Sequence, residues 1–181
     1  TIVKAEDRET FGKLLDALGV AQPAWSEAHT IDRSLQTAKD IGYPVLIRPS
    51  FVLSGKAMLV VETEDQLKEY LQSTDGDLRA HGLVITKFLQ NAIECDFDGV
   101  AREGNIIIFA LSEHVERGGV HSGDATLVLP PMTLVPAVQE KIKRDAAKIV
   151  RKLGVNGPFN IQFLVVDGEP YVIECNLRAS R

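Results

Sequence analysis

The side chains best suited to chemistry lie near the end of the chain, in two strand-like segments joined as a hairpin. Because side chains in a strand alternate between two faces, Glu174 and Asn176 share one face, and Gln162 lies on a polar face of the other strand. Oxygen ligands of this kind suit Mg²⁺ that completes its octahedron with water and phosphate oxygens. The pattern predicts an oxygen-rich cluster, with Arg178 two residues beyond it; a water-exposed polar sheet face is the alternative.

The length of the hairpin loop decides which side chains meet. A three-residue loop, Asp167-Gly168-Glu169, sets Gln162 directly opposite Glu174 and Asn160 opposite Asn176. A two-residue loop would set Gln162 opposite an isoleucine and mix a polar with an apolar face. We therefore expect the three-residue loop.

A glycine-rich stretch, Gly118 to Asp124, is the second candidate for chemistry. Its three glycines can present successive backbone N–H groups to an anion such as phosphate. An ordinary turn is the alternative, since glycine-rich loops are commonly turns. His114 has no second histidine at metal-binding spacing, so the sequence does not favour a zinc site.

Arg48 ends an otherwise apolar strand and faces a loop. Its guanidinium could hold phosphate oxygens with two hydrogen bonds. The alternative is a strand-end side chain that extends to water.

The hydrophobic periodicity predicts the elements that must position these residues. Four helices are expected where apolar residues recur at helical spacing, and strands where short apolar or alternating runs are bounded by turn residues. Hairpin-connected strands with separate helices indicate an α+β fold with mainly antiparallel sheets. The expected helices are 7–18, 31–41, 63–71 and 136–153, and the expected strands are 44–48, 58–61, 83–89, 93–100, 105–113, 125–129, 159–166 and 171–175.

The amino-acid composition disfavours several classes of function. The 181 residues are 45% hydrophobic with a net charge of -5, which describes one globular domain or two small ones. The chain shows no basic stripe with interleaved aromatic residues, so nucleic-acid binding is disfavoured. Its apolar runs are too short to span a bilayer, and membrane attachment is not expected. Cys95 and Cys175 lack metal or redox spacing, which predicts buried thiols in a reducing compartment.

Seven motifs, taken in order, resemble an ATP-grasp module of the carbamoyl phosphate synthetase large-chain family. P-loop, Rossmann and hydrolase-elbow signatures are missing from the sequence. The matching motifs are Ala5-Glu6-Asp7-Arg8, Gly42-Tyr43-Pro44 with Ile47-Arg48-Pro49-Ser50, Leu53-Ser54-Gly55, Glu113-His114-Val115-Glu116, Gly119-Val120-His121-Ser122-Gly123-Asp124, Gly157-Pro158-Phe159-Asn160-Ile161-Gln162-Phe163 and Ile173-Glu174-Cys175-Asn176-Leu177-Arg178.

Large chains of this family resemble a tandem duplication in which one half phosphorylates bicarbonate and the other phosphorylates carbamate. The loop 50–58 and Val120-His121-Ser122 are more similar to the carbamate half. The resemblance therefore implies ATP-dependent phosphorylation of carbamate to carbamoyl phosphate. The alternatives are the bicarbonate half, another ATP-grasp ligase, or a nucleotide-binding fragment without turnover.

The family pattern also implies roles for individual residues. Lys87 stands where a bacterial member carries histidine, but a contact made by its backbone would survive that change. The implied roles are Arg8 and Arg48 on the ATP phosphates, Lys87 and Leu89 near the adenine, Glu94 on the ribose, Gly119, Val120, His121 and Ser122 along the nucleotide, Gln162, Glu174 and Asn176 on two divalent ions, and Arg178 on the transferred group, with Arg48 and Arg178 as the catalytic cations.

The resemblance implies ATP and two Mg²⁺ or Mn²⁺ ions as cofactors. The expected partners are carbamate, the remainder of a synthetase large chain and a glutamine amidotransferase subunit or domain, in arginine or pyrimidine biosynthesis. The expected location is the cytoplasm, with the mitochondrial matrix as the alternative. The chain is expected to be a fragment of one module, with a nucleotide-covering part at about 50–115, metal and phosphate parts around it, and a lid at Ser50 to Lys56.

Overall fold

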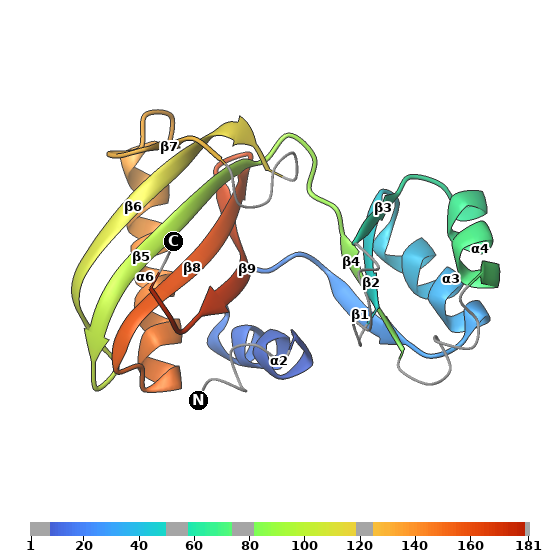
Figure 1. Cartoon of the computed structure of the whole chain (residues 1–181), viewed down its shortest axis with the longest axis horizontal. Coiled ribbons are helices and arrows are strands. Elements are labelled where there is room, and N and C mark those ends of the chain that lie inside the picture. Colours follow the sequence, from blue (N-terminus) through green and yellow to red (C-terminus); the bar gives the residue numbers. More distant parts are fainter. Residues whose placement is uncertain (1–7, 50–57, 74–81, 119–124, 180–181) are drawn as a thin grey trace. The chain divides into compact units, whose positions relative to one another are not determined.

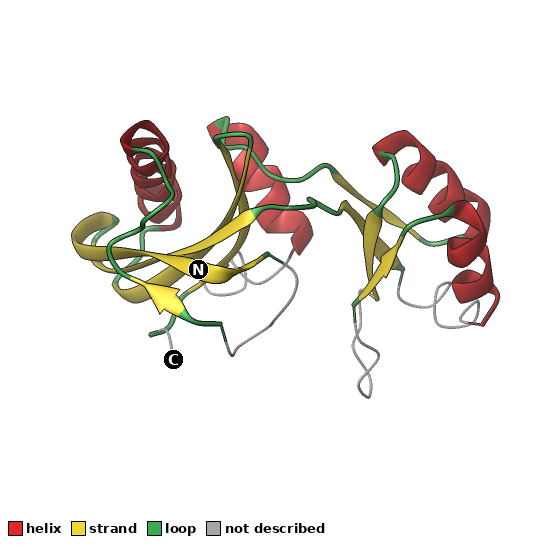
Figure 2. Ribbon diagram, turned by 90° about the horizontal axis from the view of Figure 1, so that it is seen from above, coloured by secondary structure: helices red, strands yellow, loops and turns green. Residues whose placement is uncertain are grey.

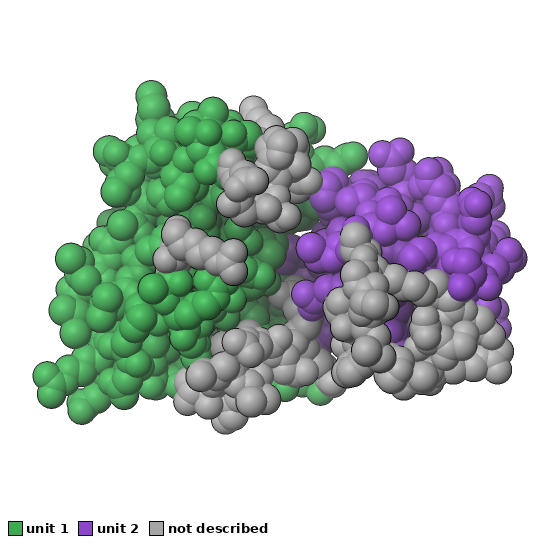
Figure 3. Space-filling view, viewed as in Figure 1, with its two compact units in different colours: residues 1–22, 89–181 green, residues 23–88 purple. Residues whose placement is uncertain are grey.

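The computed structural model describes residues 8–49, 58–73, 82–118 and 125–179. The chain divides into two compact units, which Figure 3 shows in different colours. Unit 1 combines Thr1–Gln22 with Leu89–Arg181, and unit 2 is the intervening segment Pro23–Phe88. The two termini of the chain therefore belong to the same unit, and unit 2 is inserted between them.

Unit 1 is built on a five-stranded sheet with the order β7-β6-β5-β8-β9, in which every neighbouring pair is antiparallel (Figure 1). Its two described helices, α2 and α6, lie on one side of the curved sheet (Figure 2). The elements are α2 (Arg8–Leu18), β5 (Ile93–Arg102), β6 (Asn105–Arg117), β7 (Leu127–Val128), α6 (Pro136–Leu153), β8 (Gly157–Val166) and β9 (Glu169–Asn176).

Alternation along the central strands builds the core of unit 1. Phe97 on β5 and Phe159 on β8 are buried and stack with their ring centroids 6.1 Å apart. Helix α6 covers this side of the sheet with an apolar stripe that includes Ile142 and Ile149. The helix starts with a proline, whose missing N–H costs nothing in the first turn, and ends at Gly154.

The β8–β9 hairpin has a shorter loop than the sequence predicted. Val166 pairs with Glu169, so only Asp167 and Gly168 lie in the loop. Both have positive φ, 50° and 79°, as a two-residue type I′ turn requires, and Asp-Gly is a favoured sequence for that turn. The expectation of a three-residue loop is therefore wrong.

The predicted pairing of the polar residues is nevertheless confirmed, because a β-bulge shifts the register. Phe163 pairs with Val172, but Gln162 pairs with Glu174, so Ile173 is the additional residue on β9. The bulge restores the phase that the short loop would otherwise lose. Gln162 and Glu174 consequently lie side by side on the same face.

Unit 2 is a four-stranded antiparallel sheet with the order β1-β4-β2-β3. Two helices lie on one side of it (Figure 2), and their apolar residues share a core with the sheet. The elements are β1 (Trp25–Ala28), α3 (Ile31–Ile41), β2 (Val45–Pro49), β3 (Leu59–Val61), α4 (Glu64–Ser73) and β4 (Leu83–Lys87).

The structure confirms the mixed α+β class, the mainly antiparallel sheets and the four predicted helices, but the sequence analysis missed β1. Cys95 and Cys175 are free and buried as expected; burial raises the pKa of both thiols, that of Cys175 to about 12. Among the helices of the described segments, none has the length and hydropathy needed to cross a bilayer.

Candidate functional site

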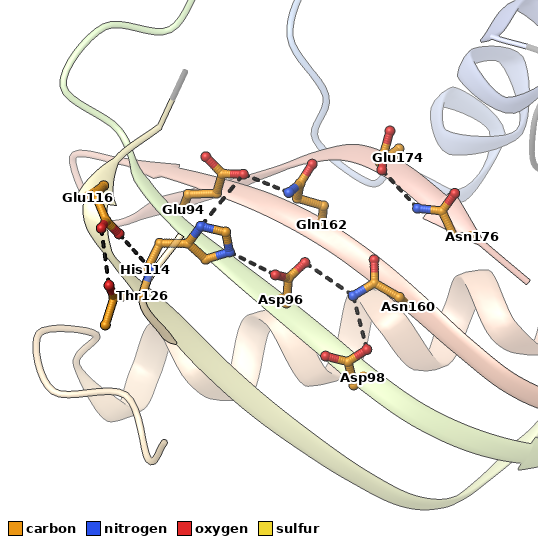
Figure 4. A network of polar contacts seen from close by, with 10 residues as sticks. All are labelled: Glu94, Asp96, Asp98, His114, Glu116, Thr126, Asn160, Gln162, Glu174 and Asn176. Atoms are coloured by element: carbon orange, nitrogen blue, oxygen red, sulfur yellow. Dashed lines mark hydrogen bonds and ion pairs between the residues drawn. The ribbon is translucent and has the colours of Figure 1, made fainter. Parts of the chain in front are cut away.

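The face of the five-stranded sheet opposite the helices carries a network of carboxylates, amides and one imidazole (Figure 4). Strand β5 places three carboxylates on this face at alternate positions, Glu94, Asp96 and Asp98. The neighbouring strand β8 places Asn160 opposite Asp98 and Gln162 opposite Asp96. A row of acids therefore lies beside a row of amides.

The amides of β8 donate their hydrogens toward the acids of β5. Gln162 Nε2 lies 2.6 Å from Glu94 Oε1. Asn160 Nδ2 lies 3.1 Å from Asp96 Oδ1 and 3.1 Å from Asp98 Oδ1. Since an amide nitrogen donates two hydrogens and a carboxylate only accepts them, this geometry fixes the orientation of both amides.

The same arrangement recurs on β9, where Asn176 Nδ2 donates to Glu174 Oε1 at 2.8 Å. Each of the three amides thus gives its nitrogen to a carboxylate, and its carbonyl oxygen points away from that carboxylate. Gln162 pairs with Glu174 and Asn160 with Asn176 across the β8–β9 ladder. The hairpin therefore brings the three predicted metal-binding residues together, as Figure 4 shows.

This donor set fits a hard divalent cation. Among the described residues, no group of three or more His, Cys, Asp or Glu side chains is arranged to hold a metal. A cation here would depend on one carboxylate, on amide oxygens and on oxygens from water or a phosphate ligand, which is the coordination that Mg²⁺ prefers. Gln162, Glu174 and Asn176 are the residues that would hold it.

His114 on β6 joins the acids of β5 from the other side. Its Nε2 lies 2.7 Å from Asp96 Oδ2, and its Nδ1 lies 3.9 Å from Glu94 Oε1. The hydrogen bond to Asp96 raises the pKa of His114 above its ordinary 6.5, against the lowering effect of burial, and the charge of Glu94 adds to the increase. A protonated His114 offsets the repulsion between the two carboxylates.

The start of the glycine-rich stretch lies against this network. A Cβ atom built on Gly118 would lie 2.7 Å from Leu164 Cδ2 and 3.5 Å from Glu94 Oε2. A larger residue here would require Leu164 to move, and the last described residue before the loop lies beside the Glu94 carboxylate. Residues 119–124, with the predicted Gly119, Val120, His121 and Ser122, lie outside the described residues.

Two glutamates of β6 fix the chain that follows the loop. Glu116 accepts hydrogen bonds from the backbone and hydroxyl of Thr126. Glu113 accepts from the backbone of Met132 and from the backbone and hydroxyl of Thr133. Burial alone would raise the pKa of Glu113, but these hydrogen bonds outweigh it and the pKa is lowered. The segment that follows the glycine-rich stretch is thus held by two side chains of β6.

Two of the predicted residues, Arg48 and Lys87, lie in unit 2. Arg48 is partly buried on β2, where it pairs with Val84 of β4. Lys87 donates from Nζ to the carbonyl oxygens of Gly42 and Tyr43, at 2.8 and 2.9 Å. Its ammonium therefore stabilises the C-terminal end of α3. The backbone N–H of Lys87 donates to the carbonyl oxygen of Ala24 at 2.7 Å, and the adenine contact stays a prediction.

The remaining predicted residues lie beyond β9, at the boundary between the two units, or outside the described part of the chain. Arg178 is exposed beyond β9, with Nη1 3.3 Å from the carbonyl oxygen of Ala179. Leu89 follows unit 2 and belongs to unit 1. Arg8 starts α2, and its side chain lies outside the described residues, as does the predicted lid Ser50 to Lys56.

Sequence reasoning missed four members of the network as functional residues: Asp96, Asp98, Asn160 and His114. The signal for the first two was present, because Glu94, Asp96 and Asp98 alternate with apolar residues as one face of a strand does. The contact of Asp96 and Asp98 with Asn160 joins positions 64 and 62 residues apart. The spacing of residues along the sequence does not predict a contact between positions so far apart.

Comparison with solved structures defines the fold. The chain resembles a biotin carboxylase–ATP complex from Campylobacter jejuni, with a TM-score of 0.79, 22% identity, and coverage of 98% of this chain and 41% of that chain. It also resembles a carboxyaminoimidazole ribonucleotide synthase from Aspergillus clavatus complexed with ATP, with a TM-score of 0.79, 16% identity, and coverage of 98% and 46%. The chain has the ATP-grasp fold, as the sequence predicted.

The chain belongs to the family described as carbamoyl-phosphate synthase L chain, ATP binding domain, which matches residues 7–181. It is 49% identical to the mitochondrial arginine-specific large chain of Neurospora crassa, over 99% of this chain and 16% of that protein. It is 49% identical to the mitochondrial carbamoyl-phosphate synthase [ammonia] of Rattus norvegicus, over 99% and 12%. With multifunctional protein ura1 of Schizosaccharomyces pombe the identity is 50%, over 98% and 8%.

Proposed function

We propose that this chain is the ATP-binding module that phosphorylates carbamate within a larger carbamoyl phosphate synthetase. The observation that carries the proposal is the β8–β9 hairpin, where Gln162, Glu174 and Asn176 share one face. The family match supports the synthetase, and the sequence likeness of 50–58 and Val120-His121-Ser122 to the second half supports carbamate as acceptor. The chain spans 16% or less of the three relatives named above, so the remaining steps belong to other parts of the protein.

The order of the residues on the polar face supports an order for the parts of Mg-ATP. Glu94 would bind the ribose hydroxyls, and the next positions toward β9, Gln162, Glu174 and Asn176, would hold two Mg²⁺ or Mn²⁺ ions. When bound, these ions neutralise charge on the phosphate oxygens during transfer. The hydrogen bond between Glu94 and Gln162 links the ribose position to the metal position.

Cationic side chains would complete the phosphate site. Arg8 and Arg48 would contact the ATP phosphates, and Arg178 would contact the transferred group, where a guanidinium can bind two oxygens at once. The backbone of Lys87 and Leu89 would meet the adenine. The loop residues Gly119, Val120, His121 and Ser122 would line the nucleotide, and Ser50 to Lys56 would close over a carbamate that water would otherwise destroy.

The relatives support one of the proposed partners, the remainder of a synthetase large chain, and the family resemblance implies the other. The module would work with the remainder of a synthetase large chain and with a glutamine amidotransferase subunit or domain. The named relatives include an arginine-specific chain and a multifunctional protein, which supports a place in arginine or pyrimidine biosynthesis. We propose a cytoplasmic location, with the mitochondrial matrix as the alternative that the two mitochondrial relatives support.

The test is Glu174→Gln in the full-length synthetase, with two partial reactions measured separately. Formation of ATP from carbamoyl phosphate and ADP reports the carbamate step, and bicarbonate-dependent hydrolysis of ATP reports the other. We expect the first to fall by roughly 100-fold, because a charged metal ligand is lost, while the second is retained. Glu174 is exposed and the change is nearly isosteric, so the fold should be unaffected.

The matched control is Glu140→Gln on α6, an exposed glutamate on the other side of the sheet. It should leave both reactions unchanged. Loss of the bicarbonate-dependent reaction by Glu174→Gln, with ATP formation retained, would assign this chain to the bicarbonate half. Retention of both reactions would remove Glu174 from the metal site.

A further inference from the structure

Asn160 occupies an unusual place on the polar face, between two aspartates of one strand and an asparagine of another. It is 7% exposed, and it is flanked by Asp98 on β5 and Asn176 on β9 in the sheet register. Its nitrogen lies 3.1 Å from Asp96 Oδ1 and 3.1 Å from Asp98 Oδ1. Both amide hydrogens are therefore directed to carboxylates.

This arrangement determines which atom Asn160 offers to a ligand. A side-chain amide has one nitrogen with two donors and one oxygen with two lone pairs. With the nitrogen held by β5, the oxygen points away from Asp96 and Asp98. Gln162, the next polar residue of β8 on this face, is held in the same way by Glu94, at 2.6 Å.

We propose that Asp96 and Asp98 are positioning residues that hold the Asn160 carbonyl oxygen toward the metal site. Asn160 then contributes a further oxygen to a divalent ion, directly or through one of its waters. The inference rests on the proposed metal site of Gln162, Glu174 and Asn176. It adds to that site two acids that would act through Asn160 rather than by contact with the ion.

Two aspartates are needed because together they exclude the alternative orientation of the Asn160 amide. A single acceptor would hold one N–H and leave the amide free to turn about its side-chain torsions. Acceptors on both hydrogens remove that freedom, and hydrogen bonds to charged acceptors are about twice as strong as neutral ones. An inverted amide would bring its oxygen toward two carboxylates and present donors to a cation, and both contacts are repulsive.

The experiment is a double-mutant cycle of Asp98→Ala and Asn160→Ala in the full-length synthetase. The principal readout is binding of Mn²⁺ in the presence of a non-hydrolysable ATP analogue, followed by the electron paramagnetic resonance signal of free Mn²⁺. Asp98 is chosen because Asp96 also binds His114. We expect Asp98→Ala to weaken Mn²⁺ binding about tenfold, the magnitude typical of residues that orient metal ligands.

The cycle separates positioning from simple loss of charge. If Asp98 acts through Asn160, Asp98→Ala has no further effect on Mn²⁺ affinity once Asn160 is alanine. If its negative charge alone attracts the cation, the loss is the same in both backgrounds, and the proposal is overturned. Asp98→Asn retains the volume and an acceptor oxygen; it should bind Mn²⁺ better than Asp98→Ala, and an equal loss in both variants would also count against positioning.

Two controls complete the design. Val100→Ala changes the next residue on the same face of β5, which is 40% exposed, and it should leave Mn²⁺ binding unchanged. A fall equal to that of Asp98→Ala would mean that strand stability, and not the aspartate, is responsible. Absence of Mn²⁺ binding by the wild type would overturn the metal site itself, and this inference with it, which distinguishes the two failures.

Discussion

The two faces of the five-stranded sheet are made by alternate residues of the same strands, but they depend on different properties of those residues. On β5, Phe97 packs beneath α6 while its neighbours Asp96 and Asp98 bind Asn160. The helix-covered face depends on volume, since it excludes water and fills space. The polar face depends on which atom donates and which accepts.

This difference predicts how substitutions on each face of the sheet affect the protein. A buried apolar residue can be replaced at modest cost by another of similar volume. A residue of the polar network cannot be replaced by shape alone, because Asn has the outline of Asp but carries a donor nitrogen in place of one acceptor oxygen. Substitutions on the first face should therefore change stability, and those on the second should change binding.

The largest effect is expected from Phe97→Ala on the helix-covered face. Phe97 is 0% exposed and stacks on Phe109 and Phe159, with ring centroids 4.8 and 6.1 Å away. Loss of the ring should lower the free energy of unfolding of unit 1 by about 3–5 kcal/mol. Hydrogen exchange of β5 and β8 amides would measure this separately from unit 2.

The comparison variant is Glu174→Gln, which should leave the exchange of the same amides unchanged while the carbamate partial reaction is lost. Phe97→Leu should recover part of the stability, because a branched apolar side chain fills some of the space. If Glu174→Gln accelerated exchange as much as Phe97→Ala, the two faces would not be separable in this way.

A smaller effect is expected from Asp96→Asn on the polar face. The hydrogen bond to Asp96 is the main cause of the raised pKa of His114, so its replacement by a neutral amide should return that pKa toward 6.5. Titration of the His114 ring by nuclear magnetic resonance measures the change. Asp98→Asn is the control, since His114 bonds to Asp96; an equal shift in both variants would contradict the assignment.

The same group makes stability depend on pH with a definite sign. Because the pKa of His114 is higher in the folded chain than its ordinary 6.5, its charged form stabilises the fold below about pH 6.5. That contribution is lost as pH rises through the raised folded value. Asp96→Asn should flatten this part of the stability profile.

The sequence predicted those parts of the fold whose signals are local. Helix α3 begins and ends where the pattern placed it, because Thr30 caps its start and Gly42 ends it. Strand β1 was missed, since Trp25–Ala28 is four residues long without clear alternation and forms by pairing with β4. Its existence depends on a partner that lies more than fifty residues further along the chain.

The candidate site was likewise predictable where its signals are local. Alternation identified Gln162, Glu174 and Asn176, and the pairing was right although the loop length was wrong, because the bulge at Ile173 compensates. Polarity of a face is a stronger constraint than loop length, since a one-residue slip would bury Glu174 or expose the core. The role of Asp98 depends on a contact 62 residues away and required the structure.

The smallest effect is expected at the edge of the helix-covered face, where Lys143 of α6 lies over the Phe109 ring at 5.3 Å from its centroid. Lys143→Gln should lower the free energy of unfolding by about 0.5–1 kcal/mol, as for exposed cation–π pairs. Because Lys143 also lies 3.8 Å from Glu140, the ring contribution is isolated by repeating the change in a Phe109→Leu background, where it should be smaller. Arg144→Gln, one residue along the exposed side of α6, is the control and should have little effect. An equal loss in both backgrounds would mean that Lys143 acts through its charge and not through the Phe109 ring. The stability of the helix-covered face would then depend on packing volume even at its edge.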